Sequence, residues 1–149
     1  MRSAAFAAVA LALALSSFIN ARLVGRLGMR RISHGAIAVF AVLSATMALL
    51  AHLGVLTLVP FMLLMAGIMF LVGMVFSNFN ALAMEPQGHI AGTASSLIGS
   101  IATLMAAIIG YVVGQAYDGT LVPLSNAYLV LAITTLAIIA VTEKGRLLR

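Results

Sequence analysis

Five apolar stretches follow one another along this chain, and only short polar links separate them. A helix needs about 20 apolar residues to cross the hydrocarbon core of a bilayer. Lipid offers the backbone no hydrogen-bond partners, and the alternating pattern of membrane strands is missing, so each stretch is predicted to be a transmembrane helix. The sequence therefore predicts an all-α, polytopic membrane protein that forms one transmembrane domain. The predicted spans are residues 4–19, 32–53, 57–84, 91–117 and 123–141.

The composition leaves little room for other classes of protein. Only 7% of the 149 residues are charged, whereas a soluble domain has about 25%, so most of the surface is expected to contact the lipid bilayer. The chain has no cysteine, and His34, His52 and His89 lie far apart, without the spacing of metal ligands. The sequence shows no nucleophile–base pair and no phosphate-binding loop. We therefore expect no catalytic residues, no metal, no cofactor and no enzymatic activity.

Two basic clusters set the predicted orientation in the membrane. Lys and Arg beside apolar spans favour the cytoplasmic side, so the clusters explain the net charge of +5 better than nucleic-acid binding does. Four predicted spans lie between the clusters, which puts both on one side. The expected topology has residues 85–89 and the C-terminus in the cytoplasm. The basic residues are Arg22, Arg26, Arg30 and Arg31 in the first cluster and Lys144, Arg146 and Arg149 in the second.

The first span allows two interpretations. Its N-terminus is expected to face outward, and a chain that starts in this way directly at a helix is expected to be cut from something longer. Alternatively, Met1, Arg2 and the apolar run before SSFINA form a signal peptide. Cleavage there would leave the arginine cluster outside, against the positive-inside bias.

The polar link ALAMEPQGHIAGTASS, residues 81–96, interrupts the apolar sequence. Pro86 is expected to end the preceding helix and to bias Glu85 away from helical geometry. The simpler interpretation is a tight helical hairpin whose Glu85 and His89 are hydrated at the membrane edge. The alternative is that Glu85 pairs with a basic loop when a cytoplasmic gate closes.

Amides inside an apolar span need hydrogen-bond partners, which makes Asn78, Asn80 and Gln115 candidates for a substrate pathway. Asn78 and Asn80 are two residues apart and therefore point about 200° apart around a helix. We expect one to face a cavity and the other to hold a neighbouring helix.

Small residues recur every four positions in the fourth span. Small side chains at this spacing let helix backbones approach closely in a membrane. The sequence therefore predicts a helix–helix contact through Gly92, Ser96, Ser100, Gly110 and Gly114.

Residues 78–99, NFNALAMEPQGHIAGTASSLIG, resemble a signature of the major facilitator superfamily, in the bicyclomycin-resistance and chloramphenicol-efflux family of its drug:proton antiporter branch. GQAYDGT at 114–120 and NARLVGRLGMRR at 20–31 agree with the same family. The resemblance covers essentially the whole chain. It implies that the five spans correspond to helices 8–12, part of the C-terminal half of a twelve-helix transporter, and that the first seven helices are absent.

The segment 20–31 also resembles the repeated G-x-x-x-D-R-x-G-x-R-R loop of the superfamily. Arg26, Gly28, Arg30 and Arg31 match, and Ala21 and Gly25 stand where the first glycine and the aspartate would be. The missing carboxylate leaves two interpretations open: the arginines set topology alone, or they also take part in gating.

The resemblance implies drug:proton antiport in a full-length parent of the bacterial inner membrane, with a small-molecule drug or metabolite and an N-terminal half as partners. It implies a central cavity lined by the first, third and fourth spans, with the second and fifth outside. Glu85, Asp118 and Glu143 all fall at the ends of spans, so we expect proton coupling to need the absent half. The alternative is a self-standing membrane interaction or assembly protein that acts as an oligomer.

Overall fold

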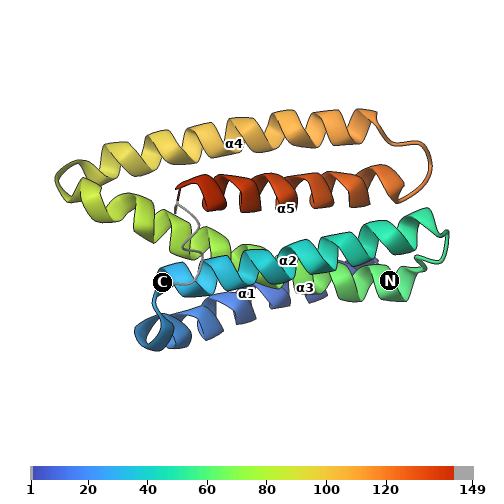
Figure 1. Cartoon of the computed structure of the whole chain (residues 1–149), viewed down its shortest axis with the longest axis horizontal. Coiled ribbons are helices and arrows are strands. Elements are labelled where there is room, and N and C mark those ends of the chain that lie inside the picture. The colour runs from blue at the N-terminus through green and yellow to red at the C-terminus, as the bar shows by residue number, and fades with distance from the viewer. Residues whose placement is uncertain (1, 143–149) are drawn as a thin grey trace.

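The computed structural model describes residues 2–142, with the side chains of residues 2–10, 12, 13 and 87 outside the description. The described residues contain helices and turns but no strand, which confirms the predicted all-α class. Successive helices run back and forth, so that α1, α3 and α5 point one way and α2 and α4 the other (Figure 1). The elements are α1 (Arg2–Leu27), α2 (Met29–His52), α3 (Leu58–Met84), the short 3-10 helix η1 (Glu85–Ile90), α4 (Ala91–Gln115) and α5 (Val122–Thr142).

In the described part of the chain, four helices are long and apolar enough to cross a membrane: Met29–His52, Leu58–Met84, Gly88–Gln115 and Val122–Thr142. They coincide closely with the four spans predicted from residue 32 onward, because span length and apolarity are local properties of the sequence. The span predicted over 4–19 falls on α1, most of whose first half lies outside the described side chains. A fifth span therefore stays a prediction.

The segment 20–31 is not a loop, contrary to the prediction. Helix α1 continues to Leu27 and α2 begins at Met29, so only Gly28 separates them. Gly28 has φ 79° and ψ 152°, a backbone conformation that glycine adopts readily because it has no Cβ. A helix satisfies its own backbone hydrogen bonds, so it can carry charged residues past an apolar stretch without uncoiling. The arginines lie on the last turns of α1 (Arg22, Arg26) and the first turn of α2 (Arg30, Arg31).

Helix α3 ends at Met84, immediately before Glu85 and Pro86, as the proline predicts. The expectation that Glu85 leaves helical geometry was wrong, because its φ of −51° and ψ of −47° are helical. Pro86 lies in the first turn of η1, where the missing N–H costs no helical hydrogen bond. The link is therefore a turn of 3-10 helix rather than irregular coil.

The core lies where α2 faces α3 and α5. Ile37, Met47 and Ile68 are almost completely buried there. On α5 the buried residues are Ser125, Ala132 and Ile139, spaced seven apart and so on one face of the helix. Helix α2 therefore lies at the centre of this packing, because α3 and α5 both pack against it.

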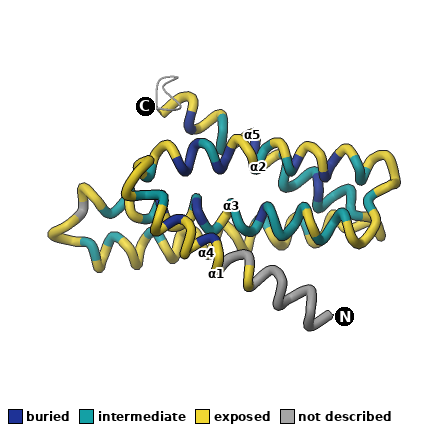
Figure 2. The backbone as a smooth tube through the Cα atoms, turned by 90° about the horizontal axis from the view of Figure 1, so that it is seen from below, coloured by how far each residue is buried: buried dark blue, intermediate teal, exposed yellow. Residues whose placement is uncertain are grey.

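Helix α4 lies apart from this core. It has no buried residue, and its contacts with α3 and α5 are few. Figure 2 shows buried positions where α2, α3 and α5 meet, whereas α4 is exposed or half-buried along its length. Its large apolar side chains, such as Leu97, Leu104 and Tyr111, are exposed. A bilayer would cover such side chains at no cost, because lipid tails are as apolar as they are.

The α1–α2 turn and η1 lie at the same end of the bundle, and the α2–α3 and α4–α5 links lie at the other (Figure 1). The first end carries the four arginines, Glu85 and His89. The predicted topology places residues 22–31 and 85–89 on the same side of the membrane, which requires both segments to lie at one end of the bundle, as they do. The second basic cluster, at 143–149, lies outside the described residues.

This arrangement predicts the labelling of single cysteines in a chain that has none of its own. Arg30→Cys and Gly88→Cys should react with a membrane-impermeant maleimide from one side of the membrane, and Val55→Cys from the other. Labelling of intact cells and of inverted vesicles measures this directly. Reaction of the Arg30 and Gly88 variants from opposite sides would contradict the arrangement of the helices.

Candidate functional site

An asparagine pair joins α1 to α3. Asn20 Nδ2 donates to Asn78 Oδ1 at 3.0 Å, and Asn78 Nδ2 donates to Asn20 Oδ1 at 2.8 Å. Both side chains are buried, where an amide without a partner is costly. The reciprocal pair satisfies one donor and the acceptor of each amide. It therefore fixes the register of α1 on α3 and supports a rigid unit.

The two asparagines of α3 point in different directions, as their spacing predicts. Asn78 holds α1, whereas Asn80 lies at the wall of a cavity and its Nδ2 donates to Phe76 O at 3.0 Å. Asn78 therefore contacts a neighbouring helix, whereas Asn80 lines the cavity. Gln115 is the last residue of α4 and is not among the residues that line this cavity. A substrate role for any of the three stays a prediction.

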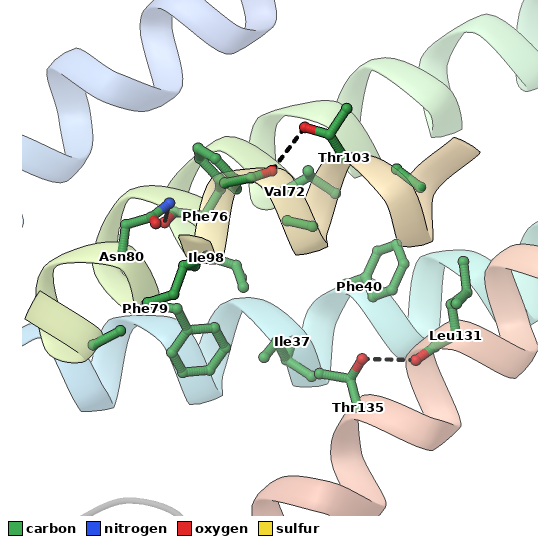
Figure 3. A pocket seen from close by; sticks show the side chains of 15 residues that line it. Ile37, Phe40, Val72, Phe76, Phe79, Asn80, Ile98, Thr103, Leu131 and Thr135 are labelled. Atoms are coloured by element: carbon green, nitrogen blue, oxygen red, sulfur yellow. Dashed lines mark hydrogen bonds between the residues drawn. The ribbon is translucent and has the colours of Figure 1, made fainter. Parts of the chain in front are cut away.

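The cavity lies between α2, α3, α4 and α5 and has a volume of about 770 Å³ (Figure 3). Small-molecule sites in proteins commonly have about 300–1,000 Å³. The aromatic wall is Phe40, Phe76 and Phe79, and Figure 3 shows Phe40 and Phe79 facing the space from α2 and α3. Among the residues whose side chains are described, those that line the cavity belong to α2, α3, α4 and α5. The central cavity implied by the resemblance, lined by the first, third and fourth spans of a full-length transporter, stays a prediction.

The polar groups of the cavity are bonded to their own helices. Thr103 Oγ1 donates to Gly99 O at 2.8 Å, and Thr135 Oγ1 donates to Leu131 O at 2.8 Å, as Figure 3 shows. Such bonds to the preceding turn satisfy a hydroxyl donor inside an apolar environment. Among the described residues, no residue that lines the cavity is charged. This part of the cavity surface is therefore uncharged and largely apolar.

The α1–α2 turn and η1 bring the four arginines and Glu85 to the same end of the bundle. Arg22 lies over the ring of Phe18, with 4.4 Å between Cζ and the ring centroid, a cation–π contact within its own helix. A pairing of Glu85 that forms only on gate closure stays a prediction, as does a role for Gly28, Pro86 and His89 in gating.

The small residues of α4 do not pack against another helix of this chain. Apart from the helix itself, no atom lies within 4 Å of the position that a Cβ would take at Gly92, Gly110 or Gly114. Ser96 Oγ donates to Gly92 O at 2.9 Å, and Ser100 Oγ donates to Ser96 O at 2.8 Å. The predicted contact is therefore not made among the described residues, and a contact with another helix stays a prediction.

Sequence reasoning missed three contacts. Asn20 is the partner of Asn78 in the asparagine pair. Ser16 and Asn20 are four residues apart and therefore share one face of α1, where both are buried. His52 Nε2 lies 3.0 Å from Asn126 Oδ1 and links the end of α2 to the start of α5. At Gly67 a Cβ would lie 3.1 Å from Leu43 Cδ1, so this glycine permits α2 and α3 to approach closely.

Asp118 stabilises the start of α5. Its Oδ1 accepts hydrogen bonds from Thr120 Oγ1 at 2.6 Å and from Thr120 N at 2.9 Å, and Thr120 Oγ1 in turn accepts from Val122 N at 3.2 Å. The hydrogen bond from the Thr120 side chain, followed by that from its backbone, lowers the pKa of the Asp118 carboxyl. Asp118 therefore has a structural role in the α4–α5 link.

Residues 2–142 hold no group of three His, Cys, Asp or Glu side chains that could bind a metal ion. The structure combines two helices joined by an asparagine hydrogen-bonded pair, an uncharged cavity, and four helices that are long and apolar enough to cross a membrane. Together they define a polytopic helical membrane protein with a cavity among its helices.

Comparison with known proteins points to transport. Over 77 residues, 51% of this chain, the sequence is 38% identical to YdgK of Bacillus subtilis (strain 168), which is described as an uncharacterized MFS-type transporter. The matched part spans 19% of that protein. No family model matches the chain, and no solved structure matches it. The similarity supports at most a relationship to the major facilitator superfamily (MFS) and suggests a membrane protein connected with transport.

The asparagine pair predicts coupled effects of mutation. Asn78→Ala leaves the Asn20 amide buried without its partner and should lower the free energy of unfolding by about 1 kcal/mol, the usual scale for interhelical hydrogen bonds in membranes. Asn20→Ala together with Asn78→Ala should cost less than the sum of the two single changes. Unfolding by dodecyl sulfate in mixed micelles measures this cycle. Additive effects would show that the two amides do not interact.

The hydrogen bonds around Asp118 lead to a prediction about the pKa of its carboxyl group. The carboxyl should titrate below the ordinary pKa of an aspartate side chain, and Thr120→Val should raise its pKa because the hydroxyl donor is lost. A lowered pKa means that the turn contributes stability above the unfolded pKa and loses it as the pH falls through the folded value. Carbon-13 NMR of labelled aspartate in micelles measures both pKa values. An unchanged pKa in the valine variant would refute this role of Thr120.

Proposed function

We propose that this chain is part of a transporter of the major facilitator superfamily. The observation that carries the proposal is the 38% identity over 77 residues to an MFS-type transporter, in a chain with four helices fit to cross a membrane. The signature-like segment 78–99 supports the same family. Its Asn78 holds α1, and its Asn80 lines the cavity.

The finer proposal is drug:proton antiport of the bicyclomycin or chloramphenicol type, carried out by a full-length parent in the bacterial inner membrane. The helices of this chain would then form most of the C-terminal half, with the arginine-rich end and the C-terminus in the cytoplasm. The uncharged cavity supports a weakly polar small molecule as cargo. A proton-carrying group would have to come from the other half, because among the described residues Glu85 lies in η1 and Asp118 in the α4–α5 link.

In such a transporter the two halves alternate around a central site. The contacts within this chain would let α1, α2, α3 and α5 move together as one rigid unit. The Asn20–Asn78 pair ties α1 to α3, and the packing of α2 against α3 and α5 extends the same unit. Helix α4 has no buried residue and makes few contacts with α3 and α5, so less packing holds it in place than holds α2.

A second candidate function is a self-standing assembly protein that works as an oligomer. It is favoured by the small-residue face of α4, whose Gly92, Gly110 and Gly114 have no described atom of another helix within 4 Å of a Cβ placed there. The mass of the purified protein in detergent discriminates between the two functions. A stable oligomer without other transporter segments favours the assembly protein, and a monomer favours the transporter.

Expression of residues 1–149 alone should not confer proton-driven drug export, because one wall of a pathway has no opposing wall against which to alternate. Accumulation of chloramphenicol and of a cationic dye, in a cell without its own efflux pumps, measures this with and without a proton gradient. An empty vector is the control. Gradient-dependent export above that control would overturn the proposed division of roles, and Glu85→Gln and Asp118→Asn would then identify the proton carrier.

A further inference from the structure

One exposed stripe of α1 changes from apolar to basic along its length. Its side chains recur every three or four residues, which keeps them on one side of a helix. The opposite side of α1 packs on α3, because Ser16 and Asn20 are buried there and Asn20 pairs with Asn78. The exposed stripe therefore points away from α3. It consists of Leu11, Leu15, Phe18, Arg22 and Arg26.

The length of the apolar part matches the depth of one leaflet of a bilayer. From Leu11 to Arg22 the helix rises by about 16 Å. The hydrocarbon core of a bilayer is about 30 Å thick, so one leaflet contributes about 15 Å. With Leu11 near the middle of the bilayer, Arg22 lies at the level of the lipid headgroups. The stripe therefore follows one lipid molecule from its acyl chain to its phosphate.

The basic end of the stripe lies where arginines outnumber carboxylates. Residues 1–84 contain neither aspartate nor glutamate. Among the described residues, Glu85 in η1 is the carboxylate at the end of the bundle that carries the four arginines. A local surplus of positive charge at a membrane surface attracts anionic groups.

Arg22 lies at the boundary between the apolar and the basic part of the stripe. Its Cζ is 4.4 Å from the centroid of the Phe18 ring, a cation–π contact that restricts where the guanidinium can lie. A guanidinium has five N–H donors, and a phenyl ring offers them no oxygen acceptor. Phosphate oxygens do, and the planar fork of arginine binds them through two parallel hydrogen bonds.

We propose that this stripe of α1 binds an anionic phospholipid, whose phosphate is held by Arg22 and Arg26 and whose acyl chain lies along the apolar part. The ligand is a lipid rather than a soluble phosphate, because a soluble anion would leave the apolar part of the stripe uncovered. A headgroup with net negative charge is preferred to a zwitterionic one, since the surplus of arginines repels the ammonium of the zwitterion. The proposal goes beyond the proposed function and requires only that α1 lies in a bilayer beside α3.

The chain contains no tryptophan, so one introduced tryptophan reports on the lipid beside it. Leu15→Trp places the reporter in the stripe, and Leu104→Trp is the matched control. Leu104 is exposed on α4 and lies about as far along its helix from the arginine-rich end of the bundle.

The whole chain is incorporated into liposomes of phosphatidylglycerol and phosphatidylcholine, in which one of the two lipids at a time carries brominated acyl chains that quench tryptophan. At Leu15→Trp the relative binding constant of phosphatidylglycerol should exceed that of phosphatidylcholine roughly fivefold. At Leu104→Trp the two lipids should quench about equally.

Removal of charge tests the arginines themselves. Arg22→Gln combined with Arg26→Gln should reduce the preference at Leu15→Trp to that at Leu104→Trp. Both arginines are exposed, so the thermal stability in detergent should stay unchanged. Arg31→Gln removes the same charge from α2, outside the stripe, and should lower the preference less than Arg26→Gln does. Equal losses in these two single variants would mean that the basic end attracts lipid diffusely, and would overturn the proposed site.

The comparison of Leu15→Trp with Leu104→Trp keeps all arginines and therefore decides the matter even if an arginine variant fails to fold. Equal quenching of Leu15→Trp by the two lipids would overturn the proposal. Protection of this tryptophan from both lipids would assign the stripe to a second copy of the chain and would also overturn it. Excess inorganic phosphate, compared with chloride at equal ionic strength, should leave the preference unchanged. Loss of the preference in phosphate would assign the arginines to a soluble anion instead.

Discussion

The lack of hydrogen-bond partners in lipid is the constraint on which this structure depends. Every long segment satisfies its backbone as a helix, and many polar side chains inside the spans bond to a neighbouring helix or to their own. The buried hydroxyls of Ser16 and Ser44 are exceptions, because neither has a hydrogen-bond partner. The Asn20–Asn78 pair is the interhelical case. The serines and threonines of α4 are the local case, since each of Ser96, Ser100 and Thr103 donates to the preceding turn. These side chains therefore need few hydrogen-bond partners from the lipid.

Helices α1, α2, α3 and α5 pack closely together, whereas α4 makes few contacts with them. Helix α2 is packed between α3 and α5, and the amide pair ties α1 to α3. Helix α4 has no buried residue and borders the cavity. A transporter wall needs both properties, because it moves as a unit and yet must contact the rest of the protein. The small-residue face of α4 provides the surface on which such a contact can form.

The distribution of charge complements this division. Arg22, Arg26, Arg30 and Arg31 gather at the end where α1 turns into α2, and Glu85 lies at the same end in η1. The membrane-crossing body between the two ends is almost free of charge, and so is the cavity within it. Among the described residues, the basic cluster and the cavity are therefore separate parts of the chain. This separation fits a small-molecule transporter better than a protein with a charged reaction centre.

The sequence by itself determined the class of protein and four of its helices, because apolar length and the effect of Pro86 are local. It also predicted that Asn78 and Asn80 point apart, since that follows from the turn of a helix. Only the tertiary structure decided which of them holds a neighbour. Asn20 and Asn78 are 58 residues apart in the chain, and their pairing depends on the rotation and register of α1 on α3, which no local pattern encodes. The central place of α2 and the cavity between α2, α3, α4 and α5 were missed for the same reason: they arise from how separate helices pack together.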